Sequence, residues 1–304
     1  MNPENRTLNH FLLTIDVEDW FQVENLRSLY PCDIWNQQEL RVERNTKQLL
    51  DLFDSLSGWD GTSIQATFFV LGWIAERCPS LVKEIHNRGH EVASHGYHHN
   101  LCRQEGAQSL RQDLSDSKRL LEDIIGSPVL GYRAPGFSID ENILTLIKEA
   151  GYLYDSSYNS FGLNPRYGQV DFSTSSREDN IIRLQDDFFE IPVSNLTLAG
   201  KTIPWAGGGY FRFYPFPLFK KGVAKILGQT GAYVFYLHPW ELDPGQPRVV
   251  GLPLLSRFRH YLNLDQVLPR LRFMIGTFAG ASFISCRQML ADTDMLVTPR
   301  GESI

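Results

Sequence analysis

The chain has 304 residues, 42% hydrophobic and 12% aromatic, so it can bury a large core without disulfides or a structural metal. Its net charge of −6 argues against nucleic acid as a partner, because such binding usually needs a basic face. Its four cysteines form no CxxC pair, which argues against a thiolate zinc site.

Two features of the sequence bear on location. No segment reaches the roughly 18 consecutive apolar residues of a membrane helix. The N-terminus lacks the basic start and the apolar run of a signal peptide. We therefore predict a cytoplasmic protein without a transmembrane segment.

Short apolar runs alternate with helical patterns along most of the chain. Strands are predicted at residues 11–15, 66–71, 91–94, 129–132, 152–154, 188–193 and 232–237. Helices are predicted at residues 80–88, over residues 110–125, and after a capping-box pattern of Ser138 and Glu141. This alternation predicts parallel βα units, either in a barrel or in an open doubly wound sheet.

The first group of chemically active residues is Asp16-Val17-Glu18-Asp19, directly after the first predicted strand. Residues two apart in an extended segment point the same way, so Asp16 and Glu18 can face one site. One carboxylate could bind a metal while the other accepts a proton from water. A solvated acidic turn or a helix cap is the alternative interpretation.

Two further groups contain histidines. His95 and His99, after the third strand, have the i, i+4 spacing that places two imidazoles on one side of a helical turn, as in many zinc sites. His238 follows the strand at 232–237, where a histidine can act as acid or base. Each could instead be a structural histidine. Together, one carboxylate and two histidines make a three-ligand metal site with positions left for water and substrate.

Four motifs follow one another along the chain: Asp16-Val-Glu18, His95-x-x-x-His99, Arg133-Ala-Pro-Gly136 and Leu237-His238-Pro. Their order resembles that of the polysaccharide deacetylase family (NodB-homology domain, carbohydrate esterase family 4). The resemblance runs from about residue 12 to about residue 240. Residues 154–157, 207–212 and 257–261 are similar to the branch linked to bacterial exopolysaccharide biosynthesis loci, whose members carry an extra C-terminal region.

The resemblance implies a particular architecture. The fold class is α/β, as a deformed (β/α) barrel of seven strands with a C-terminal helical extension. A single domain is expected over residues 1–304, with the extension from about 241 to 304 packed on the barrel. The polar stretch at 159–183 is predicted to be a long loop near the site.

It also implies roles for the catalytic residues. Asp16 corresponds to the catalytic base and His238 to the catalytic acid. Arg133 corresponds to the arginine of the third motif, which we expect to hold the site through an acidic partner such as Asp155.

The metal site departs from the family pattern in two places. His95 and His99 match the metal histidines, but Val17 stands where the family has a ligand aspartate. Glu18 is the predicted substitute, with Asp19 as the alternative. Gly96 replaces the usual Ser or Thr after the first metal histidine. One divalent ion, expected to be zinc, would be the cofactor.

Several residues near these motifs are predicted to bind the substrate, although each could be an ordinary core residue. They are Trp20, Pro135, Gly136, Asp155, Tyr210 and Trp240.

The implied function is hydrolysis of N-acetyl groups in an N-acetylhexosamine-containing polysaccharide or its precursor. Carbohydrate is the expected partner, with peripheral association with an exopolysaccharide assembly machinery. One alternative is hydrolysis of another small or cyclic amide C–N bond. A second is a metal-bearing carbohydrate-binding protein without turnover, which the presence of both Asp16 and His238 disfavours.

Overall fold

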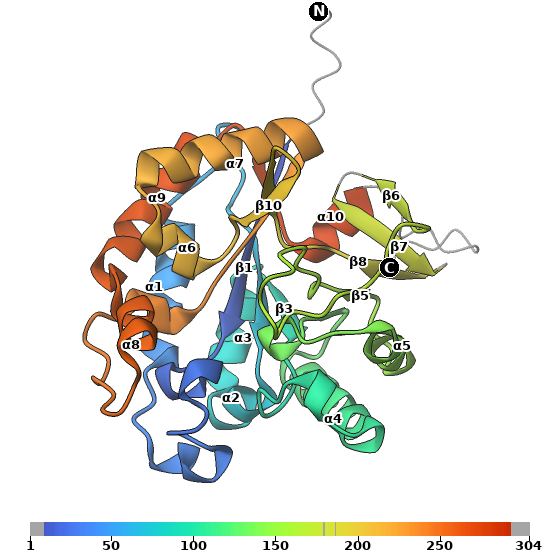
Figure 1. The fold of residues 1–304 in the computed structure, drawn as a ribbon, viewed down its shortest axis with the longest axis vertical. Coiled ribbons are helices and arrows are strands. Elements are labelled where there is room, and N and C mark those ends of the chain that lie inside the picture. Colours follow the sequence, from blue (N-terminus) through green and yellow to red (C-terminus); the bar gives the residue numbers. More distant parts are fainter. Residues whose placement is uncertain (1–8, 179, 186, 293–304) are drawn as a thin grey trace, which may run out of the picture.

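The structure, a computed structural model, describes residues 9–178, 180–185 and 187–292. Seven strands of this part run parallel in one curved sheet, surrounded by helices (Figure 1). In order across the sheet they are β11 (Ala232–Leu237), β1 (His10–Val17), β2 (Ala66–Val70), β3 (Glu91–Ser94), β4 (Gly131–Tyr132), β5 (Tyr154–Asp155) and β8 (Phe188–Glu190). The predicted α/β barrel-like fold is confirmed, and a short eighth strand, β12 (Ser282–Phe283), also runs parallel to β1.

The barrel is deformed where β8 and β11 would meet, since no ladder of the described residues joins them. Ser194 lies in this gap. Its backbone N–H donates to the Val234 carbonyl at 3.2 Å, and its Oγ accepts from the Val234 N–H at 2.9 Å. One residue therefore satisfies polar groups of β11 that a neighbouring strand would otherwise satisfy.

The remaining strands are short additions to this barrel. β6 (Ser176–Glu178) and β7 (Ile181–Gln185) extend the sheet beyond β8 in antiparallel fashion. β9 (Asn195–Leu198) and β10 (Lys201–Pro204) form a separate hairpin, and β12 (Ser282–Phe283) pairs with the start of β1. The prediction of a loop over 159–183 is therefore wrong at its end, where buried Ile181 and Ile182 favour a strand.

Helices cover the outside of the sheet. They are α1 (Val42–Asp54), α2 (Gly72–Arg77), α3 (Pro79–Asn87), α4 (Ala107–Ile125), α5 (Glu141–Glu149), α6 (Gly208–Phe213), α7 (Phe216–Thr230), α8 (Leu254–Tyr261), α9 (Val267–Thr277) and α10 (Cys286–Asp292). The N-cap of α5 is Asp140, which accepts from the Ile143 N–H at 2.9 Å, so the capping box predicted for Ser138 is wrong. No described helix is both long and apolar enough to span a bilayer.

The C-terminal residues contact the barrel at several places. Helices α8 and α9 both pack against α6, and β12 adds to the sheet. Residues 1–8 and 293–304 of the predicted domain lie outside the described residues.

The central strands are buried on both faces, which explains why they read as continuous apolar runs. In β1, Phe11 and Leu13 pack toward the surrounding helices, whereas Leu12 belongs to the cluster inside the barrel. Alternation along the strand therefore points Thr14 and Asp16 to the interior with Leu12. The interior position of Asp16 follows from the period of the strand.

Candidate active site

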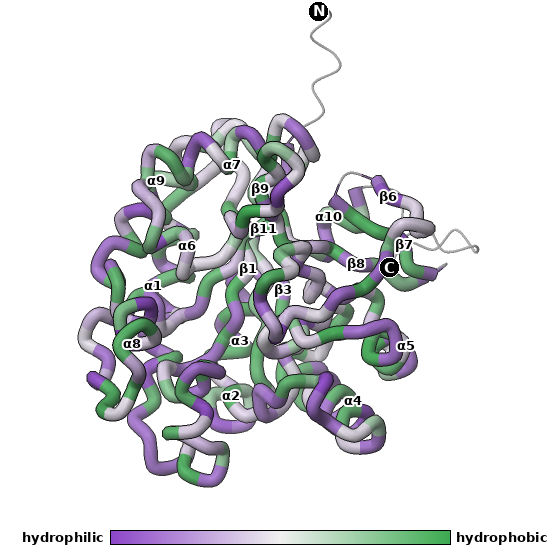
Figure 2. The backbone as a smooth tube through the Cα atoms, in the orientation of Figure 1, coloured by the Kyte–Doolittle hydropathy of each residue, from purple (hydrophilic) through white to green (hydrophobic). Residues whose placement is uncertain are grey.

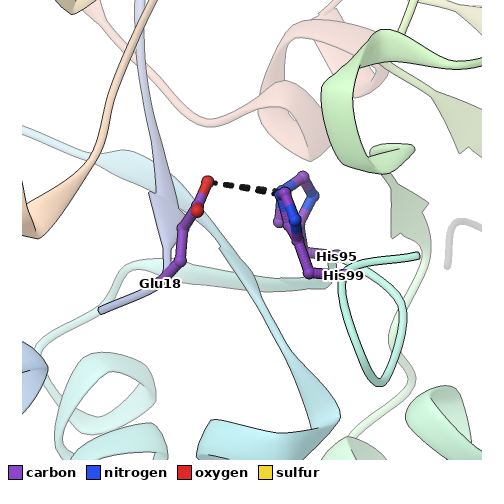
Figure 3. A group of neighbouring side chains, drawn as sticks. All are labelled: Glu18, His95 and His99. Carbon is purple, nitrogen blue, oxygen red and sulfur yellow. Dashed lines mark ion pairs between the residues drawn. The ribbon is translucent and has the colours of Figure 1, made fainter. Parts of the chain in front are cut away.

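A group of three metal-ligating side chains lies at the carboxyl ends of β1 and β3. Glu18 Oε1 is 3.6 Å from His99 Nε2 and 3.9 Å from His95 Nε2, and all three side chains are buried. Figure 3 shows the carboxylate and the two rings pointing toward one another. One ligand atom from each lies within 4.8 Å of the others. Because zinc ligands lie about 2 Å from the ion, this spacing fits one divalent ion.

His95 is held in the form that a metal requires. Its Nδ1 lies 2.8 Å from the backbone carbonyl of Arg133. Since a carbonyl only accepts, Nδ1 carries the proton and Nε2 presents its lone pair toward Glu18. Burial lowers the pKa of His95 to about 4, so the ring is neutral at physiological pH.

His95 and His99 converge from a loop, so the predicted helical turn is wrong. His99 has φ = 55°, a left-handed conformation that costs a residue with a side chain on the order of 1–3 kcal/mol. Gly96 has φ = 73°, and a Cβ there would lie 2.9 Å from Asp113 Oδ1. Because Gly96 has no Cβ, the Asp113 carboxylate fits beside the loop and accepts from the Tyr97 N–H at 3.0 Å. The loop is thus braced by Asp113, in place of a hydroxyl at position 96.

The Asp19 carboxylate is directed away from the histidines and is occupied by backbone N–H groups. It caps the turn at Trp20–Gln22, accepting from Trp20 N at 2.8 Å. Its other oxygen accepts from Arg41 N at 2.6 Å and Val42 N at 2.8 Å. Glu18 is therefore the carboxylate that faces the two histidines.

Arg133 holds Asp16 from inside the barrel. Its Nη1 donates to Asp16 Oδ1 at 2.8 Å and to Thr14 Oγ1 at 2.7 Å. The rest of the guanidinium donates to Ser156, through Nε to the carbonyl and Nη2 to Oγ, both at 2.8 Å. The side chain is fully buried and lies over the Phe69 ring at 4.1 Å. Together, these contacts fix the plane of the guanidinium, and the guanidinium in turn fixes the orientation of the Asp16 carboxylate.

Asp155 is not the acidic partner of Arg133, which corrects the prediction. Its two oxygens accept from the Ser157 hydroxyl at 2.7 Å and the Ser157 N–H at 3.1 Å. Burial raises the pKa of Asp155, and burial together with Asp155 raises the pKa of Glu190 well above its ordinary value. Of these two buried carboxyl groups, Glu190 therefore favours the protonated form more strongly.

His238, after β11, faces both carboxylates of the site. Its Nε2 is 3.1 Å from Glu18 Oε1 and 3.9 Å from Asp16 Oδ2. Its Nδ1 is 2.8 Å from Glu241 Oε1. Burial alone would lower the pKa of His238, but Glu18 and Glu241 raise it well above its usual value. The two carboxylates on either side of the ring therefore favour its charged form.

Sequence reasoning missed the two residues that support His238. Burial raises the pKa of Glu241, but Arg212 and His238 outweigh it and lower the value to about 2. Arg212 Nε donates to Glu241 Oε2 at 2.7 Å, and its Nη1 donates to the carbonyls of Arg259, His260 and Leu262 at the end of α8. The spacing of His238 and Glu241, three residues apart in one turn, was an available signal.

The site opens into a cavity of about 520 Å³. Three predicted substrate residues, Gly136, Tyr210 and Trp240, line it, and the loop before β6 contributes Arg166 and Tyr167. The Trp240 ring stacks between those of His238 and His260, at centroid distances of 5.5 and 4.5 Å.

The other three predicted substrate residues lie outside the cavity wall. Trp20 is buried, and its indole N–H donates to the Glu39 carbonyl at 3.2 Å. Pro135 and Asp155 are also buried. Pro135 begins a short turn, and the Asp155 carboxylate accepts a hydrogen bond from the Ser157 hydroxyl. Their assignment to substrate binding stays a prediction that the position of the cavity does not support.

Comparison with known families agrees with this geometry. Residues 38–154 match the family described as polysaccharide deacetylase, and residues 156–291 match a domain of unknown function (DUF3473). Residues 38–154 are thus similar to polysaccharide deacetylases, and most of the remainder of the barrel is similar to a family of undescribed function. His95, His99 and Arg133 lie in the first match and His238 lies in the second, whereas Asp16 and Glu18 precede both.

Curated relatives are similar over part of their length. A peptidoglycan-N-acetylglucosamine deacetylase of Bacillus cereus is 34% identical over 107 residues, covering 35% of this chain and 47% of that protein. A peptidoglycan deacetylase of Helicobacter pylori is 28% identical over 141 residues, covering 43% and 48%. The chain thus spans about half the length of these two relatives.

Solved structures match over almost the whole chain and show the fold. A Mycobacterium smegmatis protein described as a candidate polysaccharide deacetylase has a TM-score of 0.62 at 20% identity, covering 96% of this chain and 92% of that one. Puue allantoinase has a TM-score of 0.60 at 14% identity, covering 99% and 94%. The barrel with its C-terminal helices is therefore an architecture found in other solved structures.

Proposed function

We propose that this protein is a metal-dependent hydrolase that removes N-acetyl groups from an N-acetylhexosamine-containing polysaccharide or its precursor. The observation that carries the proposal is the pairing of a proton acceptor, Asp16, with a proton donor, His238, beside the Glu18-His95-His99 group. Holding a sugar or a metal would require neither group, whereas hydrolysis of an amide uses both.

Glu18, His95 and His99 would hold the metal, and zinc is the ion that one carboxylate and two imidazoles favour. Bound there, the ion would polarise the acetyl carbonyl and lower the pKa of a water molecule. The Arg133 carbonyl keeps His95 oriented for this role.

The chain's own residues would move the protons. Asp16, fixed by Arg133, accepts the proton of the attacking water. His238, whose charged form Glu18 and Glu241 favour, donates a proton to the departing sugar amine. An amine is a poor leaving group unless it is protonated, so the second transfer is as necessary as the first.

Two observations support a sugar as the substrate. The cavity wall carries the aromatic rings of Tyr210, Tyr236 and Trp240 near His238. The curated relatives are named as deacetylases of peptidoglycan and of chitin.

The exopolysaccharide setting is supported by the resemblance of residues 154–157, 207–212 and 257–261 to the branch linked to such loci.

Release of acetate from N-acetylated oligosaccharides by the zinc-loaded protein tests the proposal, with cyclic amides as competing substrates. Asp16→Asn and His238→Ala should each reduce turnover by roughly 10²–10⁴-fold while metal content stays unchanged. Activity of both variants within a few-fold of the unmodified protein would contradict the assigned roles. Metal and sugar binding without acetate release would favour a binding protein.

The cytoplasmic location stays a prediction. Fractionation of cells that express the native protein tests it, and recovery in the periplasm or the medium would overturn it.

A further inference from the structure

An exposed apolar patch lies at the mouth of the active-site cavity. We call it the rim patch, and its residues with their exposed fractions are Phe213 (59%), Val250 (90%), Leu254 (84%), Leu255 (70%) and Phe258 (53%). Single exposed apolar residues are ordinary, but several of them on one helix and the segments beside it are typical of an interaction site. Three of the five come from α8, which packs against α6, the helix that carries Phe213.

The apolar residues of α8 form a stripe with an arginine on each side. At 100° per residue, Leu254, Phe258 and Leu255 span one outward arc of the helix. Arg257 precedes that arc and Arg259 follows it, whereas His260 faces inward and is buried. Figure 2 shows hydrophobic and hydrophilic residues next to each other along this helix. A short amphipathic helix with a basic margin results.

These arginines are not neutralised by neighbours. No ion pair among the described residues involves Arg248, Arg257 or Arg259, and Arg248 lies instead over the Tyr261 ring at 4.3 Å. The sequence has no acidic residue between Asp243 and Asp265.

Some other surface arginines of the described residues have acidic partners. Arg88 contacts Asp51 and Asp54 at 2.8 Å, and Arg111 contacts Glu149 at 2.8 Å. Beside the rim patch, by contrast, three arginines lie close together in sequence without an acidic partner among the described residues, in a chain whose net charge is −6.

The rim patch is continuous with the cavity. Phe213, Leu255 and Phe258 line the cavity as well as the surface, and Arg259 does so beside them. Val250 and Leu254 do not line it, so their exposure is unrelated to enclosing a sugar.

We propose that the rim patch binds an anionic membrane surface, with its apolar side chains at the boundary of headgroups and acyl chains and its arginines at lipid phosphates. Both the apolar stripe and the flanking charge fit such a surface. A second copy of the chain fits less well, because a two-fold contact would bring one set of unpaired arginines against the other. In this orientation the cavity opens toward the bilayer.

Vesicle co-sedimentation of the full, metal-loaded chain tests the proposal. The protein should sediment with vesicles containing phosphatidylglycerol and much less with phosphatidylcholine alone, and added salt should weaken the binding. The double variant V250E/L254E should reduce binding by about tenfold or more, and Arg257→Gln by about fivefold. Neither variant alters a residue of the catalytic site or the cavity wall.

Trp59→Glu is the matched control, since Trp59 is 82% exposed in the segment before β2, at the other end of the barrel. It should bind vesicles like the unmodified protein. Absence of binding to phosphatidylglycerol, or equal binding by V250E/L254E, would overturn the proposal. So would a concentration-dependent dimer that this double variant abolishes, because a second copy would then occupy the patch. The measurement involves no turnover, so its outcome is separate from that of the acetate assay.

Discussion

The two regions that match different families divide the work of one site. Residues 38–154 consist of regular βα units and contribute His95, His99 and Arg133. Residues 156–291 contain antiparallel strands, a hairpin and most of the cavity rim, and contribute His238 with its support from Glu241 and Arg212. The proposed proton donor therefore comes from the region whose family has no described function.

Strand β1 precedes both regions and joins them. It pairs with β2 of the first region and with β11 of the second, and Asp16 and Glu18 lie at its end. The second region is thus part of the same barrel. A protein carrying the first region alone would have both histidines of the proposed metal site and would lack the proposed proton donor.

Removing the metal ligands should have the largest effect, and it tests the first region together with β1. Glu18→Ala and His95→Ala should each lose the ion and all measurable activity, because each removes one of three ligands. Asp19→Asn should keep its metal, since that side chain caps a turn. Metal analysis of the purified variants decides, and loss of the ion in Asp19→Asn alone would show that the assignment of the carboxylate is wrong.

A change at Glu241 tests the second region without touching the metal. Because ionised Glu241 favours the charged form of His238, Glu241→Gln should lower the pKa of His238. The limb of the pH–rate profile that reports loss of the donor's proton should then move to lower pH, and activity at neutral pH should fall by roughly 10–100-fold. Metal content is the control and should not change. A profile that superimposes on that of the unmodified protein would contradict this role.

The smallest effect is expected at the cavity wall. Tyr210→Ala should raise KM for an oligosaccharide by about three- to tenfold, because it removes one aromatic contact, and leave kcat nearly unchanged. Trp20→Phe is the comparison, since Trp20 was expected at the substrate and is buried instead. Its KM should match that of the unmodified protein. An effect on KM at Trp20 that exceeds the effect at Tyr210 would reverse the two assignments.

The strands and the ligands were predictable because their signals are local. The runs at 91–94 and 232–237 coincide with β3 and β11, since fully buried parallel strands leave continuous apolar segments. The ends of such strands meet at one edge, so Glu18, His95 and His238 could be placed together from sequence alone.

What sequence reasoning missed depends on distant or conformational information. Arg133 and Asp16 are 117 positions apart, and no spacing rule selects Asp16 over Asp155 as the partner. The interval between His95 and His99 is the same in a helical turn and in the observed loop, so the spacing could not reveal the left-handed His99. Arg212 reaches Glu241 only because α6 lies against β11.

Arg212 limits how this protein can be redesigned at the cavity rim. The Arg212 guanidinium holds Glu241, which contacts His238. The same guanidinium also donates to three carbonyls at the end of α8. Helix α8 therefore cannot be replaced by the corresponding helix of a relative with a different length. Such a replacement would move the three carbonyls away from Arg212, and the guanidinium would then no longer be held against Glu241. Remodelling of substrate choice at the rim has to keep the main-chain path of residues 259–262 and vary only the side chains.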